Sequence, residues 1–244
     1  MACVRQCSRS VETDRRNAVA VPLAVATPLA AATLRAVDGR VPGRRGRATR
    51  QRLIEATRAL LASTTLRDLK VVDIARAAGT SPATFYQYFP DIESALLALA
   101  RDLADSGSAA LRALVEQGDW SPAEIYRTAQ RVADGYLSLW EQHGALISVI
   151  DLAALEGNRR FRELRTALLS GASDALQAVI LEARNAGRLP QSTDPRALSG
   201  VLVSMLAHVA AHRRGLVAVG AGAENLRDAM AGIIAASVSG NARH

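Results

Sequence analysis

The sequence predicts an all-α protein with an N-terminal three-helix helix-turn-helix domain and a C-terminal helical bundle, about nine helices in all. Hydrophobic residues make up 49% of the 244 residues, but aromatic residues only 4%, so the core must consist mainly of Ala, Leu and Val. Such a core suits packed helices better than a β-sandwich. The chain after residue 116 shows no strand alternation, no repeat and no glycine-rich phosphate loop. Residues 71–90 show two short helical patterns joined by a tight turn.

The first helical pattern of this pair has small apolar residues on one face, namely Val71, Ile74, Ala75 and Ala78. Gly79 is expected to end the helix, because the left-handed backbone conformation needed there is favourable without a Cβ. Ser81 followed by Pro82 is a strong start signal for the next helix. These signals together predict a helix-turn-helix.

The second helix, residues 82–89, has two faces of different chemistry. Phe85 and Phe89 are four residues apart and can be buried together. The opposite face suits phosphate oxygens and close approach to base edges, and with the cap residues it forms the predicted DNA-reading surface: Ser81, Pro82, Ala83, Thr84, Tyr86, Gln87 and Tyr88. The alternative is that the aromatic residues form only a core patch.

Positive charge is concentrated around this motif. Residues 40–90 hold nine Arg and Lys70 against three acids, a surplus of +7, whereas residues 91–244 hold 15 Arg against 17 acids. A local surplus of this kind is typical of a polyanion-binding surface. The segment 40–52 is predicted to be a flexible basic arm before a helix at 49–62, with DNA contacts from Arg44, Arg45, Arg47 and, further along, Lys70. The alternative is a linker that only increases solubility.

The motif resembles the DNA-binding domain of TetR-type (TetR/AcrR) transcriptional regulators over residues 47–99. The matching residues are Asp73-Ile-Ala75, Ala78-Gly79, Ser81, Thr84-Phe-Tyr86, Tyr88-Phe89, Glu93 and Leu96. The resemblance implies nine helices and a homodimer formed through the last two. Two positions depart from the family pattern: Lys70 replaces a Ser or Thr cap, and Ile92 replaces a phosphate-binding lysine.

Three segments follow from these patterns: a disordered extension at 1–40, a helix-turn-helix domain with its arm at 41–92, and a ligand-binding and dimerisation domain at 93–244. The apolar run at 18–32 resembles a secretory signal only superficially, since Pro22 and Pro28 interrupt it. Both cysteines, Cys3 and Cys7, fall in the extension. We expect a soluble, cytoplasmic protein with no membrane association.

Glycine and proline punctuation divides the C-terminal domain into helices at 122–143, 145–156, 159–186, 194–214 and 223–239, after a helix that runs to about 116. Tyr136 and Trp140 share a helix face and combine apolar bodies with polar tips. They are predicted to line a ligand cavity with Phe161 and Met205. The alternative is that they are ordinary core residues.

His208 and His212 are four residues apart and could bind one metal ion, but no third ligand is evident beyond Asp134, Asp151 and Glu156. No catalytic arrangement of side chains is recognisable. We therefore expect no cofactor, no metal site and no enzymatic activity, and keep a helical enzyme or metal-binding bundle as the less favoured alternative.

The last two predicted helices are rich in small residues, which allow helices to approach closely: Ser199, Gly200, Ser204, Ala207, Ala210, Ala211, Ala229, Gly232, Ala235, Ala236 and Ser239. They favour a homodimer, although packing within one chain would also use them. The function predicted is a DNA-binding regulator, a repressor that binds a palindromic double-stranded operator as a dimer and is released by a small hydrophobic or amphipathic effector. A ligand-independent DNA-binding protein is the alternative.

Overall fold

The computed structural model describes residues 43–240, and this part of the chain consists of eight α-helices and one short 3-10 helix. They are α1 (Arg44–Leu61), η2 (Leu66–Asp68), α2 (Val71–Ala77), α3 (Pro82–Tyr88), α4 (Ile92–Glu116), α5 (Ile125–Leu155), α6 (Arg159–Asn185), α7 (Pro195–Ala218) and α8 (Ala223–Ser239). The all-α prediction is confirmed. The predicted extension at 1–40, with both cysteines, lies outside the described residues.

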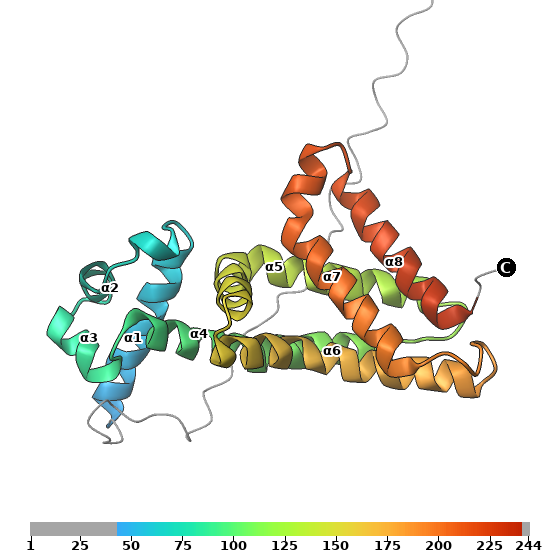
Figure 1. The fold of residues 1–244 in the computed structure, drawn as a ribbon, viewed down its shortest axis with the longest axis horizontal. Helices are drawn as coiled ribbons and strands as arrows, with labels where there is room; N and C mark the ends of the chain where they lie inside the picture. The colour runs from blue at the N-terminus through green and yellow to red at the C-terminus, as the bar shows by residue number, and fades with distance from the viewer. Residues whose placement is uncertain (1–42, 241–244) are drawn as a thin grey trace, which may run out of the picture.

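The helices α1, α2 and α3 lie together at one end of the molecule, and α4 leads from them into the bundle (Figure 1). Helix α6 packs along α4, while α7 and α8 form an antiparallel pair over α5 and α6. Buried side chains from α1 through α8 form one continuous hydrophobic core. Between residues 43 and 240, no helix is long and apolar enough to span a membrane.

The predicted break at Gly144 is wrong, because residues 125–155 form the single helix α5. Glycine is tolerated inside a helix when packing outweighs its low helix propensity. Here the buried residues Leu139, Leu146 and Ile150 continue one apolar stripe past Gly144. This merger explains why the described part of the chain has one helix fewer than expected.

The predicted flexible arm is also wrong for residues 44–48, which form the first turns of α1. The backbone N–H of Arg47 donates to the carbonyl of Gly43 over 2.9 Å, so the helix starts five residues before the predicted Thr49. Arginine is a good helix former, and the arginine-rich segment therefore extends α1 instead of remaining extended.

Candidate functional site

The turn between α2 and α3 has the geometry that its residues predict. Ile74, Ala75 and Ala78 are buried, and Gly79 has a left-handed backbone with φ of 65°. The N–H of Thr80 donates to the carbonyl of Ala75 over 2.9 Å and closes the end of α2. This turn and the buried face beneath it hold α3 against α2.

Helix α3 begins with a side-chain cap. The Ser81 hydroxyl accepts a hydrogen bond from the Thr84 N–H over 3.2 Å, and the two hydroxyl oxygens lie 3.0 Å apart. Pro82 occupies the first turn, where a missing N–H has no consequence. The start of α3 is therefore well defined, although it has only seven residues.

The two faces of α3 are separated as the sequence predicts. Phe85 is completely buried and packs against Phe89, with ring centroids 5.6 Å apart. The Tyr86 side chain is 51% exposed. The outward surface also includes the exposed residues Ser81, Pro82, Ala83 and Gln87 and the partly buried Thr84. Tyr88, which was predicted on this surface, is partly buried and packs against the hydrophobic core. This surface offers hydroxyl and amide groups from a capped helix.

Basic side chains lie on the neighbouring helix. The first turns of α1, which shares this end of the molecule with α2 and α3 (Figure 1), carry the exposed Arg44, Arg45 and Arg47. Lys70 is exposed just before α2 and makes no cap bond with its side chain. The predicted DNA-binding residues are thus brought together on one end of the molecule.

Arg50 has a role that the sequence reasoning missed. It is buried, and its guanidinium lies 5.0 Å from the centroid of the Phe89 ring, which joins α1 to the end of α3. Desolvation lowers the pKa of Arg50, and the nearby Asp102 carboxylate opposes this shift. The spacing in the sequence could have predicted this burial, because Arg50 precedes Leu53 and Ile54 by three and four residues and so lies on the buried face of α1.

The start of α4 connects the helix-turn-helix to the bundle. The Asp91 carboxylate accepts a hydrogen bond from the Ser94 N–H over 2.7 Å. Hydrogen bonding by the Ser94 side chain, together with this N–H, lowers the pKa of Asp91. The Glu93 carboxylate accepts hydrogen bonds from Asn158 Nδ2 at 3.0 Å and from an Arg160 guanidinium nitrogen at 2.7 Å. Asn158 caps α6, so this cluster, which we call the Glu93 latch, ties α4 to the α5–α6 turn.

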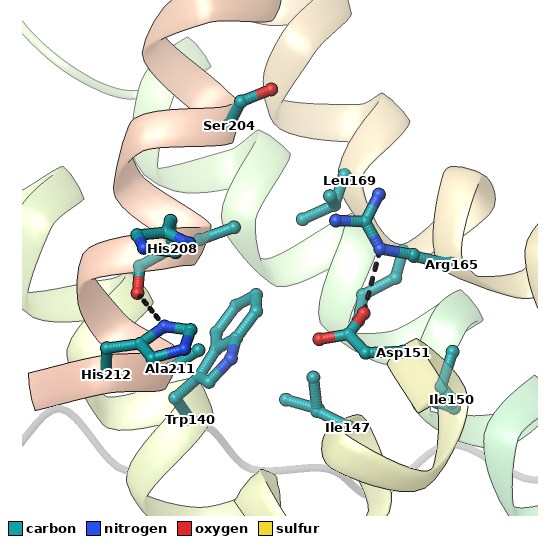
Figure 2. A pocket seen from close by; sticks show the side chains of 12 residues that line it. Trp140, Ile147, Ile150, Asp151, Arg165, Leu169, Ser204, His208, Ala211 and His212 are labelled. Atoms are coloured by element: carbon teal, nitrogen blue, oxygen red, sulfur yellow. Dashed lines mark hydrogen bonds and ion pairs between the residues drawn. The ribbon is translucent and has the colours of Figure 1, made fainter. Parts of the chain in front are cut away.

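A cavity of about 360 Å³ lies between α5, α6 and α7. Figure 2 shows Trp140 of α5 facing Asp151 of α5 and Arg165 of α6, whose Nε donates to the Asp151 carboxylate over 2.8 Å. The remaining lining residues are mostly apolar, with a hydroxyl and two imidazoles on α7: Ile147, Ile150, Leu168, Leu169, Ser204, Ala207, His208, Ala211 and His212. The cavity is therefore apolar, with a few polar groups on its wall.

Of the four residues predicted to bind a ligand, Trp140 lines this cavity. Tyr136 is fully buried and stacks on Trp140, with ring centroids 6.0 Å apart, so it supports the cavity wall from behind. Burial raises the pKa of Tyr136. Phe161 is also buried and Met205 partly buried, and neither lines the cavity. The sequence did not predict the ion pair of Asp151 with Arg165, because the two residues lie on different helices and periodicity relates only residues of one helix.

The two histidines of α7 stack on one another, with ring centroids 4.2 Å apart. His212 Nδ1 lies 3.0 Å from the His208 carbonyl oxygen, and both imidazoles face the cavity. Among the residues that the structure describes, no three His, Cys, Asp or Glu side chains are placed to hold a metal ion. The pair is thus part of the cavity wall.

Comparisons with known proteins agree with this architecture. Residues 53–99 match the family described as bacterial regulatory proteins of the tetR family, and residues 111–243, more than half of the chain, match the tetracyclin repressor-like C-terminal domain. The regulator EthR of Mycolicibacterium smegmatis is 29% identical over 145 residues, which cover 59% of this chain and 62% of that protein. The match thus spans less than two thirds of that protein's length.

Solved structures share the fold at low sequence identity. The fatty acid degradation regulator FadR from Bacillus halodurans has a TM-score of 0.58 at 18% identity, with 84% of this chain and 100% of that chain covered. FadR from Bacillus subtilis, in complex with stearoyl-CoA, has a TM-score of 0.56 at 19% identity, with 78% and 98% covered. FadR from Thermus thermophilus, in complex with lauroyl-CoA, has a TM-score of 0.52 at 19% identity, with 80% and 96% covered. With both domains matched, the chain belongs to the TetR family of bacterial regulatory proteins.

Proposed function

We propose that this protein is a homodimeric transcriptional repressor of the cytoplasm that binds a palindromic DNA operator and is released by a small hydrophobic or amphipathic effector. The observation that carries the proposal is the outward face of α3, which presents hydroxyl and amide groups at the end of the molecule that also carries the exposed arginines of α1. In the same proposal, residues 41–92 bind DNA, and residues 93–244 bind the effector and form the dimer.

The residues of α3 are assigned two kinds of DNA contact. Thr84, Tyr86 and Tyr88 position the helix by hydrogen bonds to phosphate oxygens, and such contacts carry no sequence information. Pro82, Ala83 and Gln87 approach base edges and determine sequence preference. The basic residues Arg44, Arg45, Arg47 and Lys70 add salt-dependent affinity for the backbone.

Dimerisation is assigned to α7 and α8. Both helices expose small or apolar side chains, including Val201 and Ile233, which are 65% and 48% exposed. Exposed small residues flank them, namely Ser204, Ala211, Ala229 and Ala236. Other small residues, Ser199, Ala207, Ala210 and Ala235, are buried within the chain, so the small-residue pattern serves packing inside the subunit as well.

The effector is assigned to the cavity beside Trp140. The similar FadR structures hold stearoyl-CoA in the Bacillus subtilis protein and lauroyl-CoA in the Thermus thermophilus protein, and both of these molecules carry a long apolar chain. The cavity wall here includes Asp151 at the end of α5, and the Glu93 latch joins the following turn to α4. A ligand that prefers one arrangement of α5 and α6 can therefore change the orientation of α3.

The experiment selects DNA with the purified protein and measures operator binding by variants. We expect two half-sites whose centres lie about 34–36 Å apart or a multiple of that spacing. Tyr86→Phe and Thr84→Ala should weaken binding to every sequence, whereas Gln87→Ala should change base preference. Tyr126→Phe is the control, because this tyrosine is 44% exposed on α5, in the bundle.

One result would overturn this placement of the interface. If Tyr86→Phe and Thr84→Ala bind the operator as tightly as wild type, while deletion of residues 1–39 abolishes binding, α3 is not the DNA-reading element.

A further inference from the structure

The cavity wall contains a buried hydrogen-bond donor without a partner. Trp140 is only 8% exposed, and its indole Nε1 has no hydrogen-bond acceptor among residues 43–240. Trp120, the other tryptophan, donates from its Nε1 to the Val115 carbonyl over 2.9 Å. Buried polar groups normally have partners, so the unpaired donor of Trp140 points to a ligand group that accepts its hydrogen.

An acceptor lies on the facing wall. Asp151 Oδ1 accepts from Arg165 Nε, and the other carboxylate oxygen points across the cavity toward the Trp140 indole (Figure 2). The Asp151 side chain is 34% exposed and forms an ion pair with Arg165. The cavity therefore has a donor on one side and an anionic acceptor on the other.

This pair of groups distinguishes between classes of ligand. A hydroxyl group can accept from the Trp140 N–H and donate to the Asp151 carboxylate at the same time. An ether oxygen can only accept, and a carboxylate would also be repelled by Asp151. The surrounding walls are aliphatic and aromatic, and about 360 Å³ is at the lower end of the range for small-molecule sites.

We propose that the cavity binds a neutral, largely apolar molecule with a hydroxyl group, held between Trp140 Nε1 and the Asp151 carboxylate. This inference rests on the proposed function, because it names the ligand class of the effector site. It also distinguishes this site from one for the charged acyl-CoA molecules: among the described residues that line the cavity there is one arginine, and it is already paired with Asp151. The indole nitrogen itself is covered, so binding involves a small displacement of the neighbouring side chains.

The test compares three probes with alkyl chains of seven or eight carbons: 1-octanol, methyl octyl ether and octanoate. Isothermal titration calorimetry on the full-length protein measures each dissociation constant. We expect 1-octanol to bind about tenfold more tightly than the ether, the ratio that corresponds to one net hydrogen bond, and octanoate to bind most weakly. Equal affinity for alcohol and ether, tighter binding of octanoate, or no binding of 1-octanol would each overturn the proposal.

Two variants test the assigned groups. Asp151→Ala removes the acceptor that only the alcohol can use and should reduce the ratio of alcohol to ether affinity to about one. Trp140→Phe removes an indole N–H from which both oxygens can accept, so it should weaken the binding of alcohol and ether alike. Trp120→Phe is the matched control and should keep the wild-type affinity for both probes, because its N–H is bonded elsewhere. Asp151 is partly exposed, so its replacement tests the proposal even where Trp140→Phe fails to fold.

Failure of this inference can be distinguished from failure of the proposed function. Operator binding is measured without any ligand. A protein that binds the operator but has no preference for 1-octanol refutes the ligand class alone. A protein that prefers 1-octanol but binds no DNA refutes the repressor proposal alone.

Discussion

Ile92 occupies the position at which the family resemblance implies a phosphate-binding lysine. It is partly buried in the first turn of α4 and packs against the core. A lysine stem can cover the same apolar surface while its ammonium group reaches solvent. Ile92→Lys is therefore expected to add one phosphate contact and to steepen the log–log salt dependence of DNA binding by about 0.9.

The measurement is a set of operator titrations at several salt concentrations. Leu181→Lys adds the same charge on α6, where Leu181 is 38% exposed, and should leave the slope unchanged. A folded Ile92→Lys protein with the wild-type slope would show that this position does not approach DNA.

His143 makes the stability of the protein depend on pH. It lies on α5, where burial and the nearby Arg58 of α1 lower its pKa, and its Nε2 has no partner within the described part of the chain. Below about pH 6.5, the unfolded state therefore binds a proton that the folded state excludes. The free energy of unfolding should decrease as the pH falls through this range.

Thermal unfolding of wild type and His143→Gln between pH 7 and 5 tests this expectation. The variant should lose the part of the decrease that comes from this imidazole. Parallel profiles for the two proteins would mean that His143 does not titrate differently in the folded and unfolded states.

Two glycines inside helices are expected to respond oppositely to alanine. A Cβ on Gly144 of α5 would meet no atom within 4 Å, whereas a Cβ on Gly171 of α6 would lie 2.5 Å from the backbone oxygen of Ser108 on α4. Gly144→Ala should stabilise the protein by about 0.5–1 kcal/mol, because alanine is the better helix former. Gly171→Ala should destabilise it by about 1–3 kcal/mol, because α4 and α6 must move apart.

Denaturant unfolding measures both effects, and each variant serves as the control for the other. Destabilisation by Gly144→Ala would contradict a continuous, unobstructed helix at this point. An unchanged stability for Gly171→Ala would contradict the close approach of α4 and α6.

At the scale of the whole molecule, the Glu93 latch sets how the helix-turn-helix sits on the bundle. Glu93→Ala removes the hydrogen bonds to Asn158 in the α5–α6 turn and to Arg160 in the first turn of α6. In a dimer, the loosened orientation should weaken binding to the complete operator by about 0.5–2 kcal/mol and leave binding to a single half-site unchanged. Titrations with both DNA lengths measure this difference.

Glu163→Ala is the matched control, because it breaks an exposed ion pair with Arg159 inside α6. This pair does not connect two helices, so the variant should bind both DNA lengths as wild type does. An equal loss of affinity for both lengths in Glu93→Ala would show that the latch affects α3 itself and not the relative orientation of the domains.

The helix-turn-helix could be predicted from the sequence because its signals are local. Gly79, Ser81 and Pro82 act through backbone conformation and bonds within three to five residues, and each is found in its expected role. The alternation of Phe85 and Phe89 with polar residues likewise predicted which face of α3 is buried. Family membership, confirmed by both matched domains, followed from the same residues.

Only the tertiary structure decided the features that depend on contacts between distant elements. Gly144 does not end a helix because packing on other helices holds α5 together, and Arg50 turns inward because the Phe89 ring lies over it. The cavity brings Trp140, Asp151 and Arg165 together from two helices, with α7 closing the third side. Sequence periodicity identifies which residues share a face of one helix, but the free energy of packing determines which faces meet, and that is a property of the folded chain as a whole.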